Sequence, residues 1–142
     1  MHELTVSPVV SCQSETPIRE VARLMSDRAV GCVVVLDAHG HLLGIVTDRD
    51  LTVRGLGAGL EPDAPVDAVM TRDVEWAGED VDVFAAATKM VERRCRRLPL
   101  LDPDGHLTGI MTLDDLLPLF VRQVDKIART VGGESRPPTG PV

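Results

Sequence analysis

The sequence predicts an α+β protein made of two tandem copies of one small fold, each a small β-sheet with flanking helices. Two observations lead to this prediction. A long stretch of chain recurs at a fixed offset, and each copy has an amphipathic helical stripe followed by two strand-like segments around a turn. The composition agrees, because 44% hydrophobic and 26% charged residues are ordinary for a globular protein. Aromatic residues make up only 2% of the chain, so the core must be aliphatic.

The internal repeat has an offset of 65 residues and contains no gap. It aligns Leu36–Thr47 with Leu101–Thr112. A period this long, present in only two copies, is not that of a solenoid, so we expect two units packed with pseudo-two-fold symmetry around a shared core. We assign repeat 1 to residues 1–66 and repeat 2 to residues 67–131. Residues 132–142 are rich in Gly, Ser and Pro, and we expect them to form a disordered tail.

Each repeat is expected to contain an amphipathic helix, because apolar residues recur at i, i+3, i+4 and i+7 in both copies. Thr16 followed by Pro17 is typical of a helix start, with a hydroxyl cap before a proline at the first helical position. Glu79 and Asp80 would place negative charge at the start of the second helix, which suits its dipole. The stripe residues are Ile18, Val21, Ala22 and Met25 in repeat 1, and Val83, Ala86, Ala87 and Met90 in repeat 2.

A β-hairpin is expected after each of these helices. In both repeats, a short apolar run typical of a buried strand leads into a turn sequence that ends in glycine, and a second apolar segment follows. Further helices should begin just after Thr47 and Thr112. The expected strands are Cys32–Leu36 with Leu42–Val46, and Leu98–Leu101 with Leu107–Met111.

A Thr-x-x-Asp motif stands at the start of the helix that follows each hairpin, at Thr47–Asp50 and at Thr112–Asp115. At a strand-to-helix junction this motif forms a capping box, in which the threonine oxygen accepts the third helical N–H and the acid reaches back to the N–H of the cap. The same geometry suits a ligand, because a helix N-terminus attracts phosphate and a carboxylate one turn later can accept both hydroxyls of a ribose. Capping and ligand binding both remain open from the motif alone.

The complete pattern of strand, Asp-x-x-Gly, strand and G-I-x-T-x-x-D-L occurs twice in tandem, each time after a helix that ends in Met. It resembles the tandem cystathionine-beta-synthase (CBS) domain pair, or Bateman module. The resemblance covers about residues 8 to 131. Thr47–Leu51 followed by Gly55–Leu60 also resembles the stand-alone bacterial type. The resemblance implies a regulatory or sensor module that binds AMP, ADP, ATP, S-adenosylmethionine or another adenosyl ligand in the cleft between the two CBS domains.

The resemblance also implies the residues of two unequal sites. In such modules the threonine of the motif contacts phosphate, the aspartate binds ribose, and an arginine before the preceding Leu-Pro holds phosphate. Cys32 stands at the position in repeat 1 that Arg97 has in repeat 2, and acidic residues replace the hydroxyl that Thr16 offers, so the repeat 1 motif should form the weaker site. The main site is therefore expected at Thr112, Asp115, Arg97, Thr16 and Ile110, and the weaker one at Thr47, Asp50 and Arg49.

Other functional classes find little support in the sequence. The net charge of −7 disfavours binding to nucleic acid. No nucleophile has a credible histidine partner and no glycine-rich loop matches a P-loop or Rossmann fingerprint, so we expect no enzymatic activity and no catalytic residues. The three cysteines form no CxxC pair, and His41 and His106 beside turn glycines are expected to be exposed, so no metal site is predicted. No cofactor is expected to be required, and adenine nucleotide enters as a regulatory ligand.

The expected setting is the cytoplasm, since the N-terminus lacks the features of a secretion signal and no apolar stretch is long enough to span a membrane. The expected partners are a second copy of the chain, an adenosyl ligand and an unidentified regulated protein, with neither nucleic acid nor membrane among them. The alternative is a structural homodimerisation module with vestigial ligand sites, in which the Thr-x-x-Asp motifs serve only as helix caps.

Overall fold

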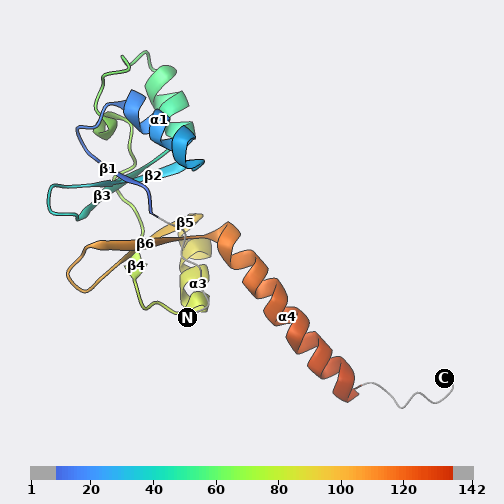
Figure 1. The fold of residues 1–142 in the computed structure, drawn as a ribbon. Helices are drawn as coiled ribbons and strands as arrows, with labels where there is room; N and C mark the ends of the chain where they lie inside the picture. Colours follow the sequence, from blue (N-terminus) through green and yellow to red (C-terminus); the bar gives the residue numbers. More distant parts are fainter. Residues whose placement is uncertain (1–8, 136–142) are drawn as a thin grey trace.

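The computed structural model describes residues 9–135 and shows two small β-sheets stacked on each other between outer helices. In Figure 1 the sheet and helices of repeat 1 lie above those of repeat 2, and helix α4 projects away from both. The predicted α+β architecture of two tandem units is confirmed. Within the described residues, no helix is long and apolar enough to cross a lipid bilayer.

The two repeats have the same order of elements. Each sheet has three strands, in the orders β1-β2-β3 and β4-β5-β6, with the first pair parallel and the second antiparallel. Repeat 1 contains β1 (Ser11–Gln13), α1 (Ile18–Arg28), β2 (Cys32–Leu36), β3 (Leu42–Thr47), α2 (Asp48–Asp50) and its π-helical continuation η1 (Leu51–Leu56). The 3-10 helix η2 (Val66–Ala68) spans the boundary that the sequence analysis placed after residue 66. Repeat 2 contains β4 (Ala77–Gly78), α3 (Val83–Arg93), β5 (Arg97–Leu101), β6 (Leu107–Thr112) and α4 (Leu113–Ser135).

The hairpins β2–β3 and β5–β6 confirm the predicted strands, but the parallel strands β1 and β4 were not predicted. They are only three and two residues long, too short for an alternating pattern to be visible. Each joins its hairpin through the parallel pairing that a helical crossover permits, with Cys12 opposite Val35 and Ala77 opposite Leu100.

The prediction of one shared core is wrong, because each repeat buries its own cluster of apolar side chains. In β2, Val33 and Val35 belong to the cluster of repeat 1, whereas Val34 is equally buried but lies outside it, as the alternation of a strand requires. Each sheet thus has one face on its own helices and one face toward the other sheet. The second cluster contains Ala77, Ala86, Met90, Leu98, Leu100, Met111 and Leu116.

The predicted starts of the first helices need correction. Helix α1 begins at Ile18 with Pro17 as its N-cap, and no side chain caps it. Thr16 is no helix cap: its Oγ1 instead accepts the backbone N–H of Gln13 at 3.2 Å. The backbone carbonyl of Ala64 accepts the N–H of Ile18, so the first turn of α1 has a partner without the hydroxyl.

Two further expectations about the helices differ from the structure. Ala22 of the predicted apolar stripe is exposed, whereas the other three stripe residues of α1 are buried. Helix α3 begins at Val83 after Asp82, and its first turn contains no acidic residue, so Glu79 and Asp80 lie before the helix.

Helix α4 is longer than predicted. It runs to Ser135, four residues into the segment that we expected to be a disordered tail from residue 132. The rest of that segment, residues 136–142, lies outside the described residues. Near its start the helix packs against α3, where the rings of Phe84 and Phe120 lie 5.3 Å apart between centroids. Beyond that contact it projects away from the two sheets (Figure 1).

Candidate functional site

The Thr-x-x-Asp motif of repeat 1 forms a complete capping box. The Thr47 Oγ1 accepts the backbone N–H of Asp50 at 3.1 Å, and Asp50 Oδ2 accepts the backbone N–H of Thr47 at 3.0 Å. The other oxygen of Asp50 lies 4.0 Å from Nε of Arg54. Both carboxylate oxygens of Asp50 are therefore occupied by the protein itself, which favours a structural role for this copy of the motif.

The motif of repeat 2 starts α4 in the same way. The Thr112 Oγ1 accepts the backbone N–H of Asp115 at 3.1 Å, and Asp115 is half-buried. The backbone N–H of Leu113 donates to the carbonyl of Arg96 at 2.8 Å, which ties the helix start to the beginning of β5. Arg97 is paired directly opposite Thr112 in the β5–β6 register, so the guanidinium and the hydroxyl belong to adjacent strand ends.

A cavity of about 190 Å³ lies between the two sheets beside these residues. It brings together Arg97, Thr112 and Ile110 of the predicted main site. Repeat 1 supplies the rest of the lining, which is almost wholly apolar: Val9, Val10, Val30, Gly31, Cys32 and Val34. Thr16 and Asp115 are not among the lining residues. The structure therefore gathers three of the five predicted residues in one cavity.

Arg97 is the principal charge in this cavity. It is half-buried, and it forms no ion pair with any side chain of residues 9–135. Its neighbour Arg96 differs, because Arg96 Nη2 lies 3.1 Å from Asp114 Oδ1 at the start of α4. A half-buried guanidinium without an ionic partner favours binding of an anion.

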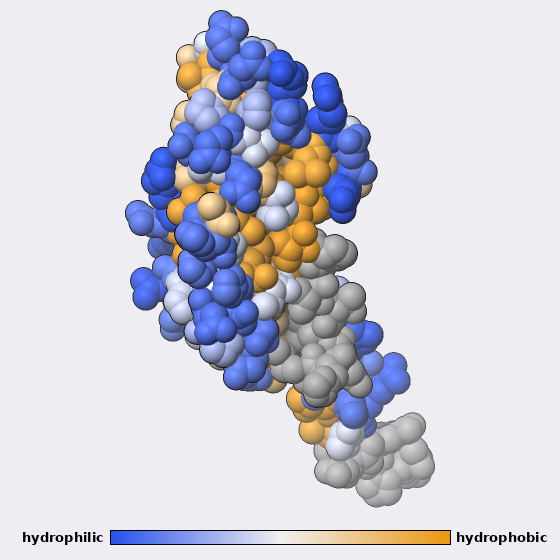
Figure 2. Space-filling model, turned by 60° about the vertical axis from the view of Figure 1, so that its left-hand side comes forward, coloured by the Kyte–Doolittle hydropathy of each residue, from blue (hydrophilic) through white to orange (hydrophobic). Residues whose placement is uncertain are grey.

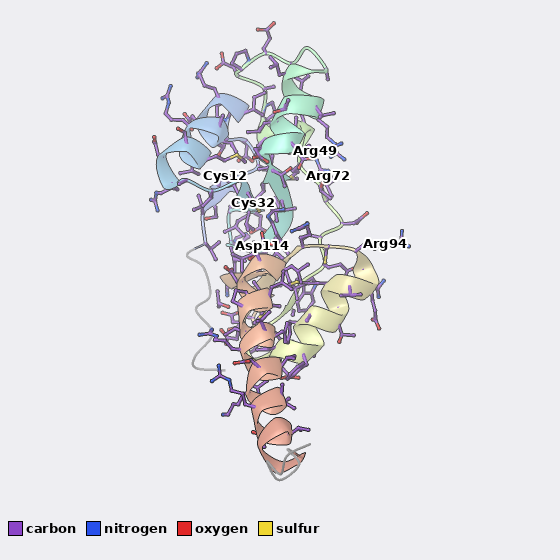
Figure 3. The ribbon with its side chains drawn as sticks, turned by 90° about the vertical axis from the view of Figure 1, so that its right-hand side faces the viewer. Cys12, Cys32, Arg49, Arg72, Arg94 and Asp114 are labelled. Carbon is purple, nitrogen blue, oxygen red and sulfur yellow. The ribbon has the colours of Figure 1, made fainter. Side chains whose placement is uncertain are left out.

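The thiol of Cys32 shows how the two repeats meet. Burial raises the pKa of Cys32 to about 11, the positive charge of Arg97 acts in the opposite direction, and the carboxylates of Asp50 and Asp48 raise it further. Cys32 therefore lies within electrostatic reach of the repeat 1 motif and of Arg97 in repeat 2, at the junction of the repeats. Figure 3 shows Cys32 in the upper repeat and Asp114 at the start of α4 in the lower one.

Thr16 lies elsewhere in repeat 1, in the turn between β1 and α1. Its hydroxyl hydrogen-bonds the thiol of Cys12, which lowers the pKa of that thiol against a larger rise caused by burial. Arg49 is exposed on α2, and its backbone N–H donates to Oδ1 of Asp48. Neither side chain lines the cavity that holds Arg97.

Several lining residues were missed by the sequence analysis. Val9 and Val10 precede a strand too short to be predicted, yet the carbonyl of Val10 accepts the N–H of Val34 at 2.9 Å and so fixes this segment against the sheet. Val34 was expected only as a core residue. The available signal was the continuous apolar run of β2, since a strand that is apolar at every position is buried on both faces.

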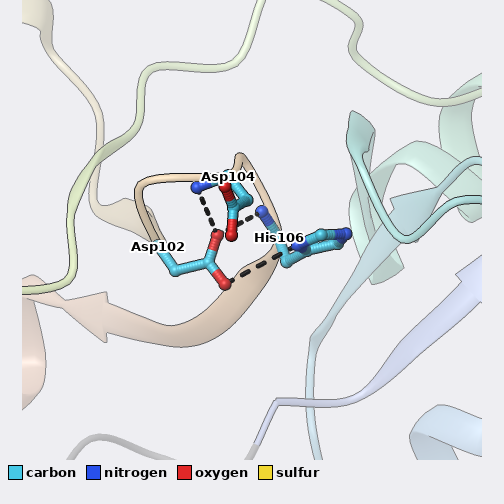
Figure 4. Close-up of side chains that lie close together, drawn as sticks. All are labelled: Asp102, Asp104 and His106. Atoms are coloured by element: carbon cyan, nitrogen blue, oxygen red, sulfur yellow. Dashed lines mark hydrogen bonds and ion pairs between the residues drawn. The ribbon is translucent and has the colours of Figure 1, made fainter.

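A second group of polar side chains lies in the turn of the β5–β6 hairpin. Asp102, Asp104 and His106 have potential metal-ligand atoms within 4.8 Å of one another. Asp102 Oδ1 accepts the backbone N–H groups of Asp104 and His106 at 2.9 and 2.8 Å, and Oδ2 lies 3.6 Å from His106 Nδ1 (Figure 4). The carboxylate of Asp102 therefore has a structural role, because its hydrogen bonds close the turn.

With this geometry in place, comparison with known proteins decides the family. The family model described as CBS domain matches residues 2–56 and again residues 66–122. The chain belongs to the CBS-domain family. Each matched range contains one hairpin and one Thr-x-x-Asp motif.

CBS-domain relatives of similar size are found among curated proteins. The CBS domain-containing protein YhcV of Bacillus subtilis is 34% identical over 112 residues, which is 79% of this chain and 74% of the relative. Other relatives are longer: the chain spans 56% of a Methanopyrus kandleri protein, at 34% identity, and 22% of the inosine-5'-monophosphate dehydrogenase of Thermoplasma acidophilum, at 37% identity. In that dehydrogenase the match covers only a fraction of the enzyme.

Solved CBS pairs have the same fold. The CBS domain pair of protein MJ0100, in complex with 5-methylthioadenosine and S-adenosyl-L-methionine, superposes with a TM-score of 0.73 at 27% identity and covers 85% of this chain and 94% of that one. The CBS domain protein PAE2072 of Pyrobaculum aerophilum, complexed with AMP, has a TM-score of 0.71 at 26% identity, with coverages of 81% and 88%.

Proposed function

We propose that this CBS pair is a regulatory module that binds an adenine nucleotide in the cavity between its two sheets. The observation that carries the proposal is Arg97, a half-buried cation without an ionic partner in residues 9–135, directly opposite Thr112 and beside an apolar cavity. Two related CBS pairs have adenosyl compounds in their complexes, which supports the same ligand class here.

The lining suits the parts of a nucleotide. Valine side chains can make apolar contact with a flat base. Arg97 can form a charge-assisted hydrogen bond with a phosphate, and the Thr112 hydroxyl can form a neutral one. At about 190 Å³ the cavity is smaller than the roughly 300–1,000 Å³ of typical ligand pockets. The base is therefore the part that enters it, while ribose and phosphate lie at its mouth, near Asp115 and the N-terminus of α4.

The charge of Arg97 also predicts which adenosyl ligands bind more tightly. A phosphate is attracted by the guanidinium, whereas the sulfonium of S-adenosylmethionine is repelled by it. AMP, ADP or ATP is therefore the preferred ligand class. In repeat 1, Cys32 takes the place of Arg97, and the nearby charges of Asp48 and Asp50 are negative, so Thr47, Asp50 and Arg49 form a weaker second site.

The competing function is a structural homodimerisation module, and the complete capping box at Thr47 and Asp50 favours it for repeat 1. Calorimetric titration with AMP, ADP, ATP and S-adenosylmethionine separates the two. We expect one nucleotide per chain, with the phosphorylated ligands binding more tightly than S-adenosylmethionine. If no compound in this series binds, the structural module is the correct function.

The proposed mechanism is regulatory and involves no catalysis. A nucleotide that contacts both sheets favours the arrangement of repeats in which both contacts form, and so shifts the population toward it. An unidentified protein in the cytoplasm that distinguishes the two arrangements would be the regulated partner. We propose no required cofactor, and neither nucleic acid nor membrane as a partner.

We also propose that the chain forms a homodimer. Large apolar side chains remain exposed on the outer helices of both repeats, including Leu56 at 79% and Phe84 at 60% exposure. Apolar surface of this kind on helices usually marks an interface. Light scattering at micromolar concentration should give twice the mass of one chain, and a monomer mass would reject the proposal.

A further inference from the structure

A second pocket, of about 410 Å³, lies where the two hairpins meet the chain that links the repeats. Two residues of each hairpin line it, together with four residues of the linker, which we define as residues 69–76 between η2 and β4. The hairpin residues are His41 and Leu42 of the first hairpin and Leu101 and Gly105 of the second. Figure 2 shows that hydrophobic surface is exposed midway along the main body, where the repeats meet. A ligand in this pocket would contact both repeats at once.

The pocket is separate from the cavity that contains Arg97. The two linings have no residue in common, and no residue of either Thr-x-x-Asp motif lines the pocket. The repeat offset shows where a second, symmetry-related nucleotide cavity would lie, because Val9 and Val10 correspond to Val74 and Glu75. Of the positions found in this way, only Val74 lines the pocket. The nucleotide sites therefore do not account for it.

The linker is held at both ends. Near its start, the backbone N–H of Thr71 donates to the carbonyl of Ile45 in β3 at 2.8 Å, and the N–H of Ile45 donates to the carbonyl of Thr71 at 3.0 Å. At its end, Lys89 of α3 donates to the carbonyl of Trp76 and lies 5.7 Å from the centre of the indole ring, while its Nζ is 3.9 Å from Glu75 Oε2. The backbone between these points is thus fixed, and a pre-organised site loses less entropy on binding.

Arg72 and Asp73 bring opposite charges to the pocket without neutralising each other. Both are exposed, and neither forms an ion pair with any side chain in residues 9–135. Nη2 of Arg72 donates to the carbonyl of Asp67 at 3.4 Å, which is long for a hydrogen bond. The charges of both side chains therefore remain available to a ligand.

The rest of the lining is largely apolar. Trp76 is 49% exposed, Leu42 and Val74 are half-buried, and Leu101 is buried. An indole held at the surface by α3 offers a large, rigid contact to an apolar group. The pocket thus combines an apolar wall with one positive and one negative side chain.

This pair of charges selects the ligand class. A phosphate would be attracted by Arg72 and repelled by Asp73, so the pair gives it little net attraction. A molecule that carries an anionic and a cationic group close together satisfies both side chains, and an α-amino acid has these two groups on one carbon. An apolar side chain on the same carbon would complete the match to the pocket.

We propose that this pocket binds a free α-amino acid with an apolar side chain. The carboxylate lies against Arg72, the ammonium group against Asp73 and the side chain against Trp76 and Leu42. The volume of the pocket is within the roughly 300–1,000 Å³ of small-molecule sites. Because such a ligand contacts both hairpins and the linker, it acts on the junction of the repeats independently of the nucleotide.

The fluorescence of Trp76 tests the proposal directly, because it is the single tryptophan of the chain. In a titration of the whole chain with L-leucine or L-phenylalanine up to millimolar concentration, we expect a saturable change in emission. L-Leucinamide lacks the carboxylate and N-acetyl-L-leucine lacks the ammonium group, so each should bind at least about fivefold more weakly than L-leucine. No binding by fluorescence or calorimetry, or equal binding of all three leucine compounds, overturns the proposal.

Variants of the two charged residues test their roles. Arg72→Gln and Asp73→Asn should each weaken L-leucine binding at least about fivefold. Arg23→Gln and Asp27→Asn are the matched controls, since both residues are exposed on α1 and neither lines the pocket. The controls should bind L-leucine as wild type does, and equal losses in all four variants would reject the assigned contacts.

Nucleotide provides the last control. Saturating AMP should not displace L-leucine, and Arg97→Ala should bind L-leucine as tightly as wild type, because Arg97 does not line the pocket. Competition between AMP and L-leucine would place both in one site and overturn the proposal. If AMP does not bind at all, the proposed nucleotide function fails, whereas the L-leucine titration still decides this proposal.

Discussion

The imidazole rings of His41 and His106 stack with their centroids 5.0 Å apart and their planes inclined by 28°. The two residues are equivalent in the internal repeat and form an antiparallel bridge between the hairpin turns of the two sheets. Their contact therefore lies on the pseudo-two-fold axis. A Cβ added at Gly105, whose φ of +87° already strains other residues, would lie 3.4 Å from Cδ2 of His41. The turns are thus fitted to each other as well as to their own strands.

This stack predicts a measurable coupling between the repeats. In a double-mutant cycle with His41→Ala and His106→Ala, we expect a coupling free energy of about 0.5–1.5 kcal/mol, the range for paired rings. His39→Ala is the control, since its ring is 6.4 Å from that of His41 and belongs to the same turn. Urea unfolding of the four proteins gives the coupling, and additive effects would mean that the stack contributes no stability.

The aspartates of these turns predict how stability responds to acid. The pKa of Asp37 is lowered chiefly by the hydrogen bond from the backbone N–H of His41, and that of Asp102 in the same way by His106. Because both pKa values are lower in the folded chain, the ionised carboxylates favour folding. Their contribution is complete above the unfolded pKa of about 3.9 and disappears as the pH falls through the folded values.

The measurement is the free energy of unfolding as a function of pH. Wild type should lose stability below about pH 4, and Asp37→Asn with Asp102→Asn should make that loss smaller. If the double variant follows the same pH dependence as wild type, these two carboxylates are not responsible for it.

The adjacent residues Arg96 and Arg97 form a matched pair for the ligand site. Arg97→Ala should weaken nucleotide binding at least about tenfold, because a charge-assisted hydrogen bond contributes roughly 1.5–3 kcal/mol. Arg96→Ala removes the same charge, but Arg96 is paired with Asp114 and does not line the cavity, so its effect should be smaller. Calorimetry gives both constants. Equal losses would indicate only a general attraction by positive charge.

The threonines of the two motifs separate capping from ligand binding. Thr47→Ala and Thr112→Ala should each lower the stability of the free protein by about 1 kcal/mol, since each hydroxyl accepts a helical N–H at 3.1 Å. Saturating AMP should raise the melting temperature of wild type and of Thr47→Ala, and raise that of Thr112→Ala much less. The same rise in both variants would assign Thr112 to capping alone.

Substitution of the aspartate in each motif tests which of the two binds the ribose. Asp115→Ala should weaken nucleotide binding at least about tenfold. Asp50→Ala should matter less, because Cys32 stands in repeat 1 where repeat 2 has Arg97, so the repeat 1 motif lacks that positive charge. If Asp50→Ala abolishes binding while Asp115→Ala does not, the main site lies at the motif of repeat 1.

Long, repeated patterns were predictable, and short or distant relationships were not. The apolar run that begins at Cys32 and the turn after Leu36 specify the first hairpin locally, and the repeat extends that prediction to the second. Strands β1 and β4 are held by pairing with a strand some twenty residues away in the chain, and a segment of two or three residues carries no periodic signal of its own. The start of α1 was misplaced because the distant carbonyl of Ala64, rather than the hydroxyl of Thr16, accepts its first N–H.

Some residues of the candidate site were predictable from the sequence, and others were not. Arg97 and Thr112 were predictable because they belong to a repeated local motif, and the β5–β6 register brings them together. The valines that complete the cavity come from the other repeat, and only the stacking of two sheets brings them there. Arg97 and Cys32 were compared as equivalent residues in the sequence, but their electrostatic contact depends on tertiary structure.

The separation of the two apolar clusters has a consequence for folding cooperativity. Each repeat retains a complete buried cluster of its own, so the halves can lose structure one at a time, with the His41–His106 contact and the packed sheet faces as the coupling between them. A ligand held by Arg97 on one side and Val34 on the other would add its own contacts to that coupling. Nucleotide bound between the repeats would then strengthen this coupling, so that the two halves unfold in one transition instead of two.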